Sequence, residues 1–284
     1  MPVPSSAGKD HRMTRVWLDP LTRYYLRDAG ARGPLLLMYH AIERRGSSAS
    51  QWVIPLARFT SHLDLLQGEG FRCASLEDMV AGRAGPRCFA ITFDDGYEDN
   101  LAAFEVLVHR GLSAAIFVVT DHIGGRAQWE SDPHLSGRDM MSGAQLRGLL
   151  AAGVTVGSHT MTHPHLPKLD RESQKREIAV SRERLGDTLG QLPQYFAYPY
   201  GLFDEVAETL VEDAGYAGAC STRSGYHRGP EERFRMRRLT VFGYDGTGTL
   251  ARKLALADND GSWPKLAEMT IRGISRRLPG RQLL

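Results

Sequence analysis

CFAITFDDGY, residues 88–97, is the segment from which the architecture of this chain is most readily predicted. It begins with a run of strand-forming residues, Cys88 to Phe93, whose length and composition predict a buried strand. Two adjacent carboxylates, Asp94 and Asp95, follow at once, and Gly96 favours a turn there. An Asp-Asp-Gly sequence is by itself usually only a turn. Whether it marks a functional site therefore depends on which residues follow the other predicted strands.

Similar strand-length segments recur along the chain, and most of the intervening regions carry apolar residues at helical spacing. This alternation predicts an α/β fold, a distorted barrel of seven or eight mostly parallel strands surrounded by helices. The expected strands are Leu35 to Tyr39, Phe71 to Ala74, Cys88 to Phe93, Ala114 to Thr120, Val154 to Ser158, Tyr195 to Tyr198, Tyr216 to Thr222 and Leu239 to Phe242.

Several helix ends are also marked in the sequence. Ser142 and Asp204 are each placed to cap a helix, and Gly153 and Gly215 follow the expected ends of those helices. A longer and heavily charged helix is expected after Asp170. Its inward-facing residues are predicted to be Ile178, Leu185 and Leu189.

Length and composition predict one substantial core. A chain of 284 residues with 42% hydrophobic and 24% charged residues is long enough to bury one. We expect an N-terminal extension over residues 1–33, a barrel over residues 34–250 and a basic, helical C-terminal tail over residues 251–284. The tail either packs on the barrel or lies as an amphipathic helix on a membrane surface.

Charge and cysteine content narrow the class of protein. The formal net charge of +2 gives no reason to expect nucleic acid as a partner. Cys73, Cys88 and Cys220 are odd in number and widely spaced, so we predict free thiols that pack as small hydrophobes. The first 15 residues lack the apolar core of a secretory signal, and no apolar run approaches the ~20 residues needed to span a bilayer. A cytoplasmic location is therefore expected, with peripheral membrane contact through the basic tail as an alternative.

Polar side chains follow four of the predicted strands. The carboxyl ends of parallel strands gather at one end of a barrel, where the active sites of such barrels form. Two histidines four residues apart can converge on one ion, although such a pair alone is often coincidental. We therefore expect one site that contains the polar residues at these strand ends, which are His40, Asp94, Asp95, His159, His163 and Tyr200.

Three motifs make this arrangement specific: TFDDG at 92–96, HTMTH at 159–163 and YPYG at 198–201. Their order and separation resemble the polysaccharide deacetylases of the carbohydrate esterase type, also called NodB-homology proteins, over roughly Leu35 to Phe242. The LMYH segment at 37–40 further resembles the subgroup that deacetylates poly-N-acetylglucosamine and related exopolysaccharides.

The resemblance implies roles for individual residues. Asp95, His159 and His163 would bind a divalent metal, commonly zinc in this family, with cobalt or nickel as substitutes. Asp94 would be the general base, and the backbone N–H of Tyr200 would help to hold the oxyanion. The implied protein is a metal-dependent hydrolase that removes N-acetyl groups from the N-acetylhexosamine units of a polysaccharide, oligosaccharide or glycan precursor. Its partner would be an N-acetylated glycan or glycoconjugate.

Two departures from the family pattern affect the proton-transfer residues. Ala197 stands where many members have an arginine that orients the base, and no histidine follows Phe242 to match the C-terminal leucine and histidine motif that supplies the acid. In the subgroup that LMYH resembles, a histidine after the first strand takes the acid's role, which assigns it to His40. The alternative is that His40 only packs near the site.

Other functions remain open from the residues alone. Two histidines and a carboxylate also form the facial triad of iron oxygenases, although those proteins usually use a double-sheet barrel. A non-catalytic glycan-binding relative and a deacetylase of small, non-polymeric substrates are further alternatives. Four aromatic residues are either sugar-stacking walls or packing residues: Tyr97, Trp129, Phe203 and Tyr244.

Overall fold

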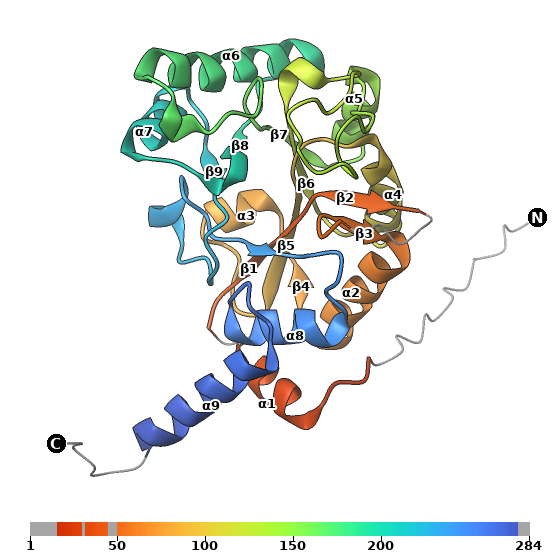
Figure 1. Cartoon of the computed structure of the whole chain (residues 1–284), viewed down its shortest axis with the longest axis vertical. Helices are drawn as coiled ribbons and strands as arrows, with labels where there is room; N and C mark the ends of the chain where they lie inside the picture. Colours follow the sequence, from red (N-terminus) through yellow and green to blue (C-terminus); the bar gives the residue numbers. More distant parts are fainter. Residues whose placement is uncertain (1–15, 30–31, 45–49, 278–284) are drawn as a thin grey trace, which may run out of the picture.

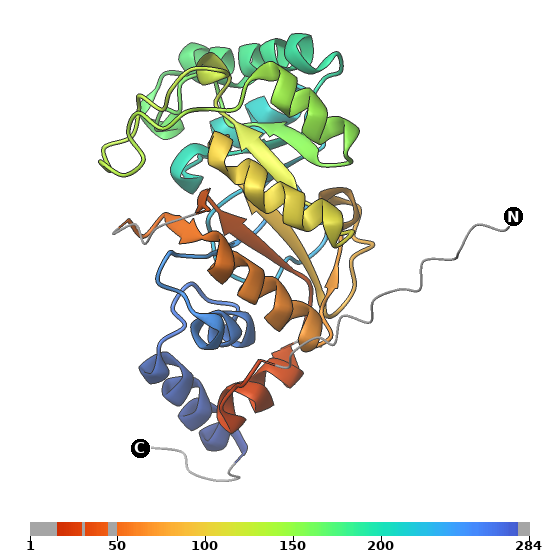
Figure 2. The same cartoon turned by 90° about the vertical axis from the view of Figure 1, so that its right-hand side faces the viewer.

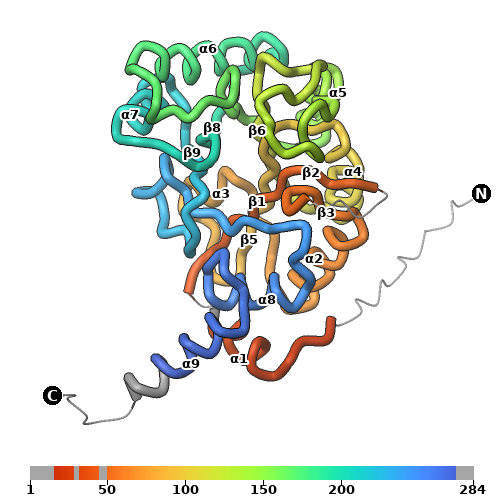
Figure 3. The backbone as a smooth tube through the Cα atoms, in the orientation of Figure 1, coloured from red at the N-terminus to blue at the C-terminus, as the bar shows by residue number. Residues whose placement is uncertain are grey.

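The computed structural model describes residues 16–29, 32–44 and 50–277 (Figure 1). Its main sheet has eight parallel strands, of which seven follow the order β10-β1-β5-β6-β7-β8-β9, while β4 pairs with the start of β5. They are β1 (Leu35–Tyr39), β4 (Arg72–Cys73), β5 (Cys88–Phe93), β6 (Ala115–Val118), β7 (Thr155–Ser158), β8 (Tyr195–Ala197), β9 (Gly218–Cys220) and β10 (Leu239–Thr240). The sheet curls into a half-barrel, so the predicted α/β distorted barrel is confirmed (Figure 3).

Helices surround the sheet. They are α1 (Pro20–Ala29), α2 (Leu56–Gly68), α3 (Leu76–Val80), α4 (Leu101–His109), α5 (Gly143–Ala151), α6 (Arg171–Leu189), α7 (Glu205–Asp213), α8 (Thr247–Leu256) and α9 (Trp263–Arg277). Short 3-10 turns occur at η1 (Glu98–Asn100), η2 (Thr120–His122), η3 (Leu166–Lys168), η4 (Pro199–Gly201) and η5 (Pro230–Glu232). None of the helices in the described ranges combines the length and apolar character needed to cross a bilayer.

All eight predicted strands are present, several of them shorter than predicted. β5 is buried along its whole length, as a strand covered on both faces must be. The structure adds two strands that the sequence analysis did not predict, β2 (Ala41–Glu43) and β3 (Val53–Pro55), which form a separate parallel pair. This pair lies immediately after β1, beside the carboxyl ends of the main strands.

The predicted helix starts are confirmed by their capping hydrogen bonds. The Ser142 side chain accepts the N–H of Gln145 in a capping box, and Asp204 accepts the N–H of Ala207 at 2.8 Å. Asp170 caps α6 in the same way. The three apolar residues expected on the inner side of α6 are buried: Ile178, Leu185 and Leu189.

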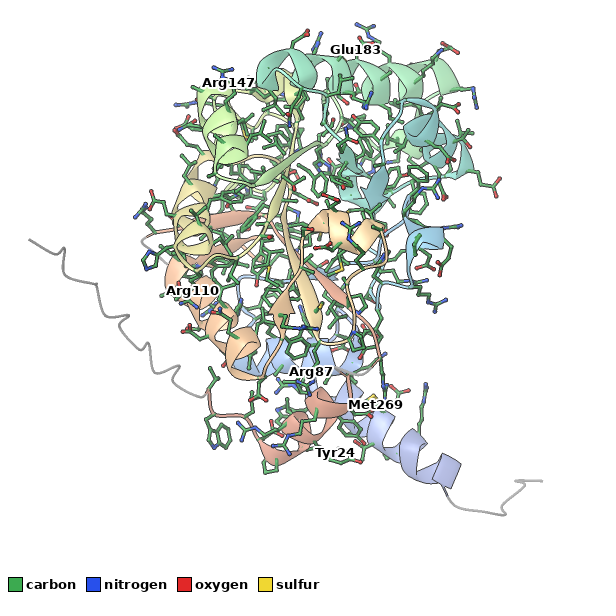
Figure 4. All side chains as sticks on the ribbon, turned by 180° about the vertical axis from the view of Figure 1, so that it is seen from behind. Tyr24, Arg87, Arg110, Arg147, Glu183 and Met269 are labelled. Carbon is green, nitrogen blue, oxygen red and sulfur yellow. The ribbon has the colours of Figure 1, made fainter. Side chains whose placement is uncertain are left out.

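The cysteines are free, as predicted. Cys88 and Cys220 are buried in the second core cluster, and Cys73 is half-buried. At the far end of the molecule, α1 packs against α8, and α9 continues from there (Figures 1 and 2). Tyr24 of α1 and Met269 of α9 lie at this same end in the reverse view (Figure 4).

One gap in the half-barrel is important for the site. β9 and β10 lie at opposite ends of the strand order, and the chain between them closes part of the gap. Met236 forms a parallel bridge with Cys220, and the N–H of Arg238 donates to the carbonyl of Arg223 at 3.0 Å. The segment Met236 to Arg238 therefore lies along β9, where the Arg238 side chain is fully buried.

Candidate active site

Asp95 occupies the sharp turn that ends β5. Its backbone has a φ of 73°, in the left-handed region that few residues other than glycine adopt. Gly96 follows with a φ of 99°, and a Cβ at that position would lie 2.2 Å from Cγ1 of Val118. Glycine is therefore required there, and the turn holds the Asp95 carboxylate at the carboxyl ends of the strands. Such backbone strain is common at functional sites.

His159 follows β7 and has a fixed orientation. Its Nδ1 lies 2.7 Å from the carbonyl oxygen of Ala197, so Nδ1–H donates there and Nε2 remains available. This is the second hydrogen bond that metal-binding histidines usually make. Position 197, where the family's arginine is absent, thus still contributes to the site through its backbone.

The loop that carries His163 is anchored to α6. Glu177 accepts hydrogen bonds from the N–H groups of Met161 at 2.9 Å and Thr162 at 3.0 Å, and from the Thr162 hydroxyl at 2.8 Å. His163 itself has a φ of 63°, and its N–H donates to Oγ1 of Thr160 at 3.0 Å. Glu177 therefore stabilises the strained turn that presents His163.

The three predicted ligands converge. Asp95 Oδ1 lies 3.6 Å from His159 Nε2 and 3.4 Å from His163 Nε2, and one ligand atom from each residue lies within 4.8 Å of the others. Bonds of ~2.1 Å at tetrahedral angles place two ligand atoms about 3.4 Å apart. Both Asp95 oxygens are buried and have no hydrogen-bond partner in the described ranges. This donor set fits a divalent ion.

The charges at this cluster also favour a cation. Burial lowers the pKa values of His159 and His163, so both rings are neutral, which is the form that binds metals. Burial and the nearby carboxylates of Glu130 and Asp94 raise the pKa of Asp95 well above its usual value. A bound cation would reverse that shift, because it stabilises the ionised carboxylate.

Asp94 is held differently from its neighbour. Arg238 donates two hydrogen bonds to it, from Nη1 to Oδ1 at 2.6 Å and from Nη2 to Oδ2 at 2.8 Å. Arg238 is itself fixed by the Ser221 carbonyl at 2.9 Å and by Thr92 Oγ1 at 3.1 Å. Burial alone would raise the pKa of Asp94, but the charge of Arg238 and its hydrogen bonds outweigh burial and keep the pKa below its usual value. Asp94 is therefore an ionised carboxylate at neutral pH.

Arg238 is a residue of this site that the sequence analysis did not predict. It supplies the arginine–carboxylate pair that seemed absent at position 197, from a position 144 residues away from Asp94. No local motif marks Arg238, since it lies just before a two-residue strand. The sequence could have indicated only that such a residue exists, because a buried carboxylate such as Asp94 needs a cationic partner.

His40 lies directly after β1 and lines the same cavity as the other site residues. Its ring packs against Trp52 with the ring centroids 4.6 Å apart, and its Nδ1 is buried without a hydrogen-bond partner among the described residues. Burial lowers the pKa of His40 to about 4 despite the nearby charge of Asp94. His40 is thus neutral at pH 7 before substrate binds.

The cavity has a volume of about 410 Å³. It is lined by Asp94, Asp95, His159, His163 and His40, and also by Trp52, Glu130, Asp132 and Asn259. Tyr200 has a φ of 57° and also lines the cavity; its ring lies 4.5 Å from that of His163 and stacks on that of His165 at 4.0 Å. All six site residues predicted from the sequence therefore line one cavity.

The four candidate stacking residues divide into two groups. Tyr97 is fully buried, and Phe203 stacks on Tyr198 at 4.6 Å, so both are packing residues. Trp129 lies 5.2 Å from the ring of His163, and its indole N–H donates to Glu130 at 2.9 Å. Tyr244 is 64% exposed, outside this cavity. Only the last two remain candidates for contact with a sugar.

The chain is similar in sequence and in fold to several known proteins. A family model described as polysaccharide deacetylase matches residues 81–219. A putative polysaccharide deacetylase, YxkH from Bacillus subtilis, is 29% identical over 212 residues, which cover 72% of this chain and 70% of that protein. The structure of IcaB from Ammonifex degensii has a TM-score of 0.67 at 25% identity and covers 78% of this chain and 97% of that one. The Streptococcus pyogenes deacetylase PplD has a TM-score of 0.65 at 20% identity and covers 78% and 98%.

Proposed function

We propose that this chain, which is similar to polysaccharide deacetylases over residues 81–219 and to YxkH over 212 residues, is a carbohydrate deacetylase. It hydrolyses a non-peptide amide bond and removes N-acetyl groups from N-acetylhexosamine units in a metal-dependent reaction. The observation that carries the proposal is the convergence of three ligand atoms beside a separate, arginine-paired carboxylate in one cavity. This arrangement provides both a metal site and a base. The proposed substrate is a polymer or oligomer of N-acetylglucosamine.

Asp95, His159 and His163 would hold the ion, and zinc is the metal we propose, with cobalt or nickel as substitutes. Such an ion acts as a Lewis acid that polarises the acetamide carbonyl and makes a nearby water more acidic. Three protein ligands leave coordination positions open for water and substrate.

Asp94 accepts a proton from the attacking water in this scheme. The Arg238 pair keeps Asp94 ionised and fixes the direction in which its oxygens point. Attack of the water oxygen on the acetyl carbon gives a tetrahedral intermediate with negative charge on the former carbonyl oxygen. The backbone N–H of Tyr200 is assigned to donate to that oxygen. The bond between the water oxygen and the acetyl carbon forms before the C–N bond breaks.

His40 is assigned the last proton transfer. An amide anion is too basic to leave, so the nitrogen must receive a proton as the C–N bond breaks. Since His40 is neutral in the free protein, it must first gain a proton, which it takes from solvent after substrate has bound and negative charge develops on the oxyanion. The proton that Asp94 accepted from the water returns to solvent, so both residues end the cycle in their starting states. The products are acetate and the free amino sugar.

The test of this function is acetate release from N-acetylglucosamine oligomers by zinc-loaded protein. Asp94→Asn should retain the ion and lose about 10² to 10⁴-fold in turnover, because it removes the positioned base and leaves the three proposed metal ligands in place. It also breaks the pair with Arg238, so the assay is run below the melting temperature of the variant. Asp213→Asn, an exposed change at the end of α7, is the matched control and should behave as wild type.

The alternatives give different outcomes in the same assay. Release of acetate from small acetamides but not from oligomers would favour a non-polymeric substrate. Glycan binding without any acetate release would favour a non-catalytic relative. Near wild-type release by Asp94→Asn would show that the roles of the two aspartates have been misassigned.

A further inference from the structure

A second cavity lies beside the active site. It has a volume of about 350 Å³ and is bordered by the segment after β10, by α8 and by the start of α9. Its rim holds Tyr244, Thr249, Arg252, Asp260 and Trp263. Both cavities fall in the size range of small-molecule sites. The residues of this second cavity lie outside residues 81–219, which the family model matches.

The two cavities share one residue, Asn259. The side-chain oxygen of Asn259 accepts the N–H of Thr240 at 2.8 Å, which fixes the orientation of the amide. Its amide nitrogen makes no hydrogen bond within the described ranges. Asn259 therefore stands between the cavities with two donors available to a ligand that extends from one to the other.

A continuous series of aromatic rings joins the two cavities. His40 and Trp52, in the catalytic cavity, have centroids 4.6 Å apart; Trp52 and Phe242 are 5.3 Å apart; Phe242 and Tyr244 are 5.3 Å apart. Tyr244 lies on the rim of the second cavity. The series follows the segment that connects β10 to α8 beside β2 and β3 (Figure 1).

The rim of the second cavity combines exposed rings with polar groups. Tyr244 is 64% exposed and Trp263 is 49% exposed, although large aromatic side chains usually bury their rings. The Arg252 guanidinium lies 4.6 Å from the Trp263 ring centroid and supports one face of it. A pyranose has apolar C–H faces and a hydroxyl rim, so exposed ring faces with polar neighbours suit it.

Buried contacts fix the segment Gly243 to Asp245 beside the second cavity. Lys253 and Asp245 form a buried ion pair, and Lys253 also donates to the Thr240 carbonyl at 3.0 Å. The Nε2–H of His62 donates to the Asp245 carbonyl at 2.7 Å. At Gly243, a Cβ would lie 2.4 Å from the carbonyl oxygen of Val53, so the segment can pack this closely only with glycine. These contacts fix the backbone of the segment that carries Tyr244 against α8 and β3, so less ordering is needed on that side of the cavity when a ligand binds.

We propose that this cavity is a second glycan subsite, which binds a sugar unit of the same polymer while another unit lies in the catalytic cavity. Tyr244 and Trp263 contact the faces of the sugar ring, and Asn259 donates to hydroxyl or acetamide oxygens between the two units. The proposal rests on the proposed function, since it requires a polymeric or oligomeric glycan. It predicts that affinity rises with the length of the glycan.

The test compares the binding of glucosamine dimers and hexamers, in β-1,4 and β-1,6 linkage, to zinc-loaded protein by calorimetry. These fully deacetylated products are not turned over, so binding is measured independently of catalysis. For at least one linkage the hexamer should bind about ten-fold or more tightly than the dimer. Trp263→Ala and Tyr244→Ala should each reduce that ratio several-fold, and Trp263→Phe should retain most of it.

Trp17→Ala is the matched control. Trp17 is 81% exposed and belongs to neither cavity, so its substitution should leave the hexamer-to-dimer ratio unchanged. Equal affinity of wild-type protein for dimer and hexamer in both linkages would overturn the subsite. So would an unchanged ratio in Trp263→Ala and Tyr244→Ala with normal melting temperatures. Acetate release is a separate assay, so failure of the proposed function is distinguishable from failure of the subsite.

Discussion

Asp94 and Asp95 are adjacent in sequence, but their surroundings shift their pKa values in opposite directions. Asp94 has the Arg238 guanidinium on both of its oxygens, whereas Asp95 has no hydrogen-bond partner in the described part of the chain and faces two imidazole nitrogens. Two carboxylates with pKa values pushed in opposite directions suit two different roles. The structure thus offers a physical reason for assigning the base to one and the metal to the other.

Arg238→Gln tests the electrostatic part of that assignment. Arg238 holds the pKa of Asp94 below its usual value, so Asp94 stabilises the fold above pH ~4 and loses that effect as pH falls through its folded pKa. Without the guanidinium the pKa of Asp94 should rise, and the acidic limb of the kcat/KM profile should move to higher pH. The melting temperature should also fall, since removal of one partner of a buried pair costs ~3 to 5 kcal/mol. An acidic limb that does not move would contradict this role for Arg238.

His40→Ala tests the proton donor. The variant should bind zinc normally and lose about 10² to 10⁴-fold in turnover of an N-acetylated glycan. The loss should be much smaller on an aryl acetate, whose leaving group needs little protonation. Equal losses on the two substrates would indicate that His40 shapes the cavity rather than delivering a proton, and loss of zinc would place it in support of the metal site.

At the scale of elements, the HTMTH loop depends on a helix that the motif does not include. Glu177 on α6 accepts three hydrogen bonds from Met161 and Thr162, between the two histidines. Glu177→Gln should weaken zinc affinity by about 10 to 100-fold, as changes to groups that support metal ligands typically do. Zinc affinity measured by chelator competition checks this prediction.

The same helix provides the control for Glu177. Glu183 is exposed on the outer side of α6 and points away from the barrel (Figure 4). Glu183→Gln removes an equal charge from the same helix and should leave zinc affinity unchanged. Equal affinities in the Glu177 and Glu183 variants would show that the loop holds its shape without α6.

The elements themselves were largely predictable, and their ends were not. β5 has the predicted bounds because its apolar run stops abruptly at Asp94, whereas β9 spans only Gly218–Cys220 of the longer segment Tyr216 to Thr222. Apolar composition reports burial, but strand length depends on which neighbours are available to pair. β2 and β3 went unpredicted because three residues are too few to show a period.

At the scale of the whole molecule, the sequence analysis predicted the cavity residues that belong to local motifs. It did not predict those that the order of the strands brings to the cavity from distant parts of the chain. Asp95, His159 and His163 follow strands whose order could be expected from the α/β alternation. Arg238 reaches Asp94 only because β10 pairs with β1 while the preceding segment lies along β9. Asn259 reaches the catalytic cavity only because α8 returns the chain to β10. Neither contact has a sequence period or spacing that reveals it.

The most direct test of a metal-dependent deacetylase centre is a zinc titration of chelator-stripped protein, with acetate release from an N-acetylglucosamine oligomer as the readout. Activity should rise linearly and level off at about one zinc ion per chain, because a single cluster of three ligands is expected to hold the ion. The His163→Ala variant should show no comparable rise at the same zinc concentrations. Full acetate release by metal-free wild-type protein, or release that does not depend on added zinc, cobalt or nickel, would contradict the account.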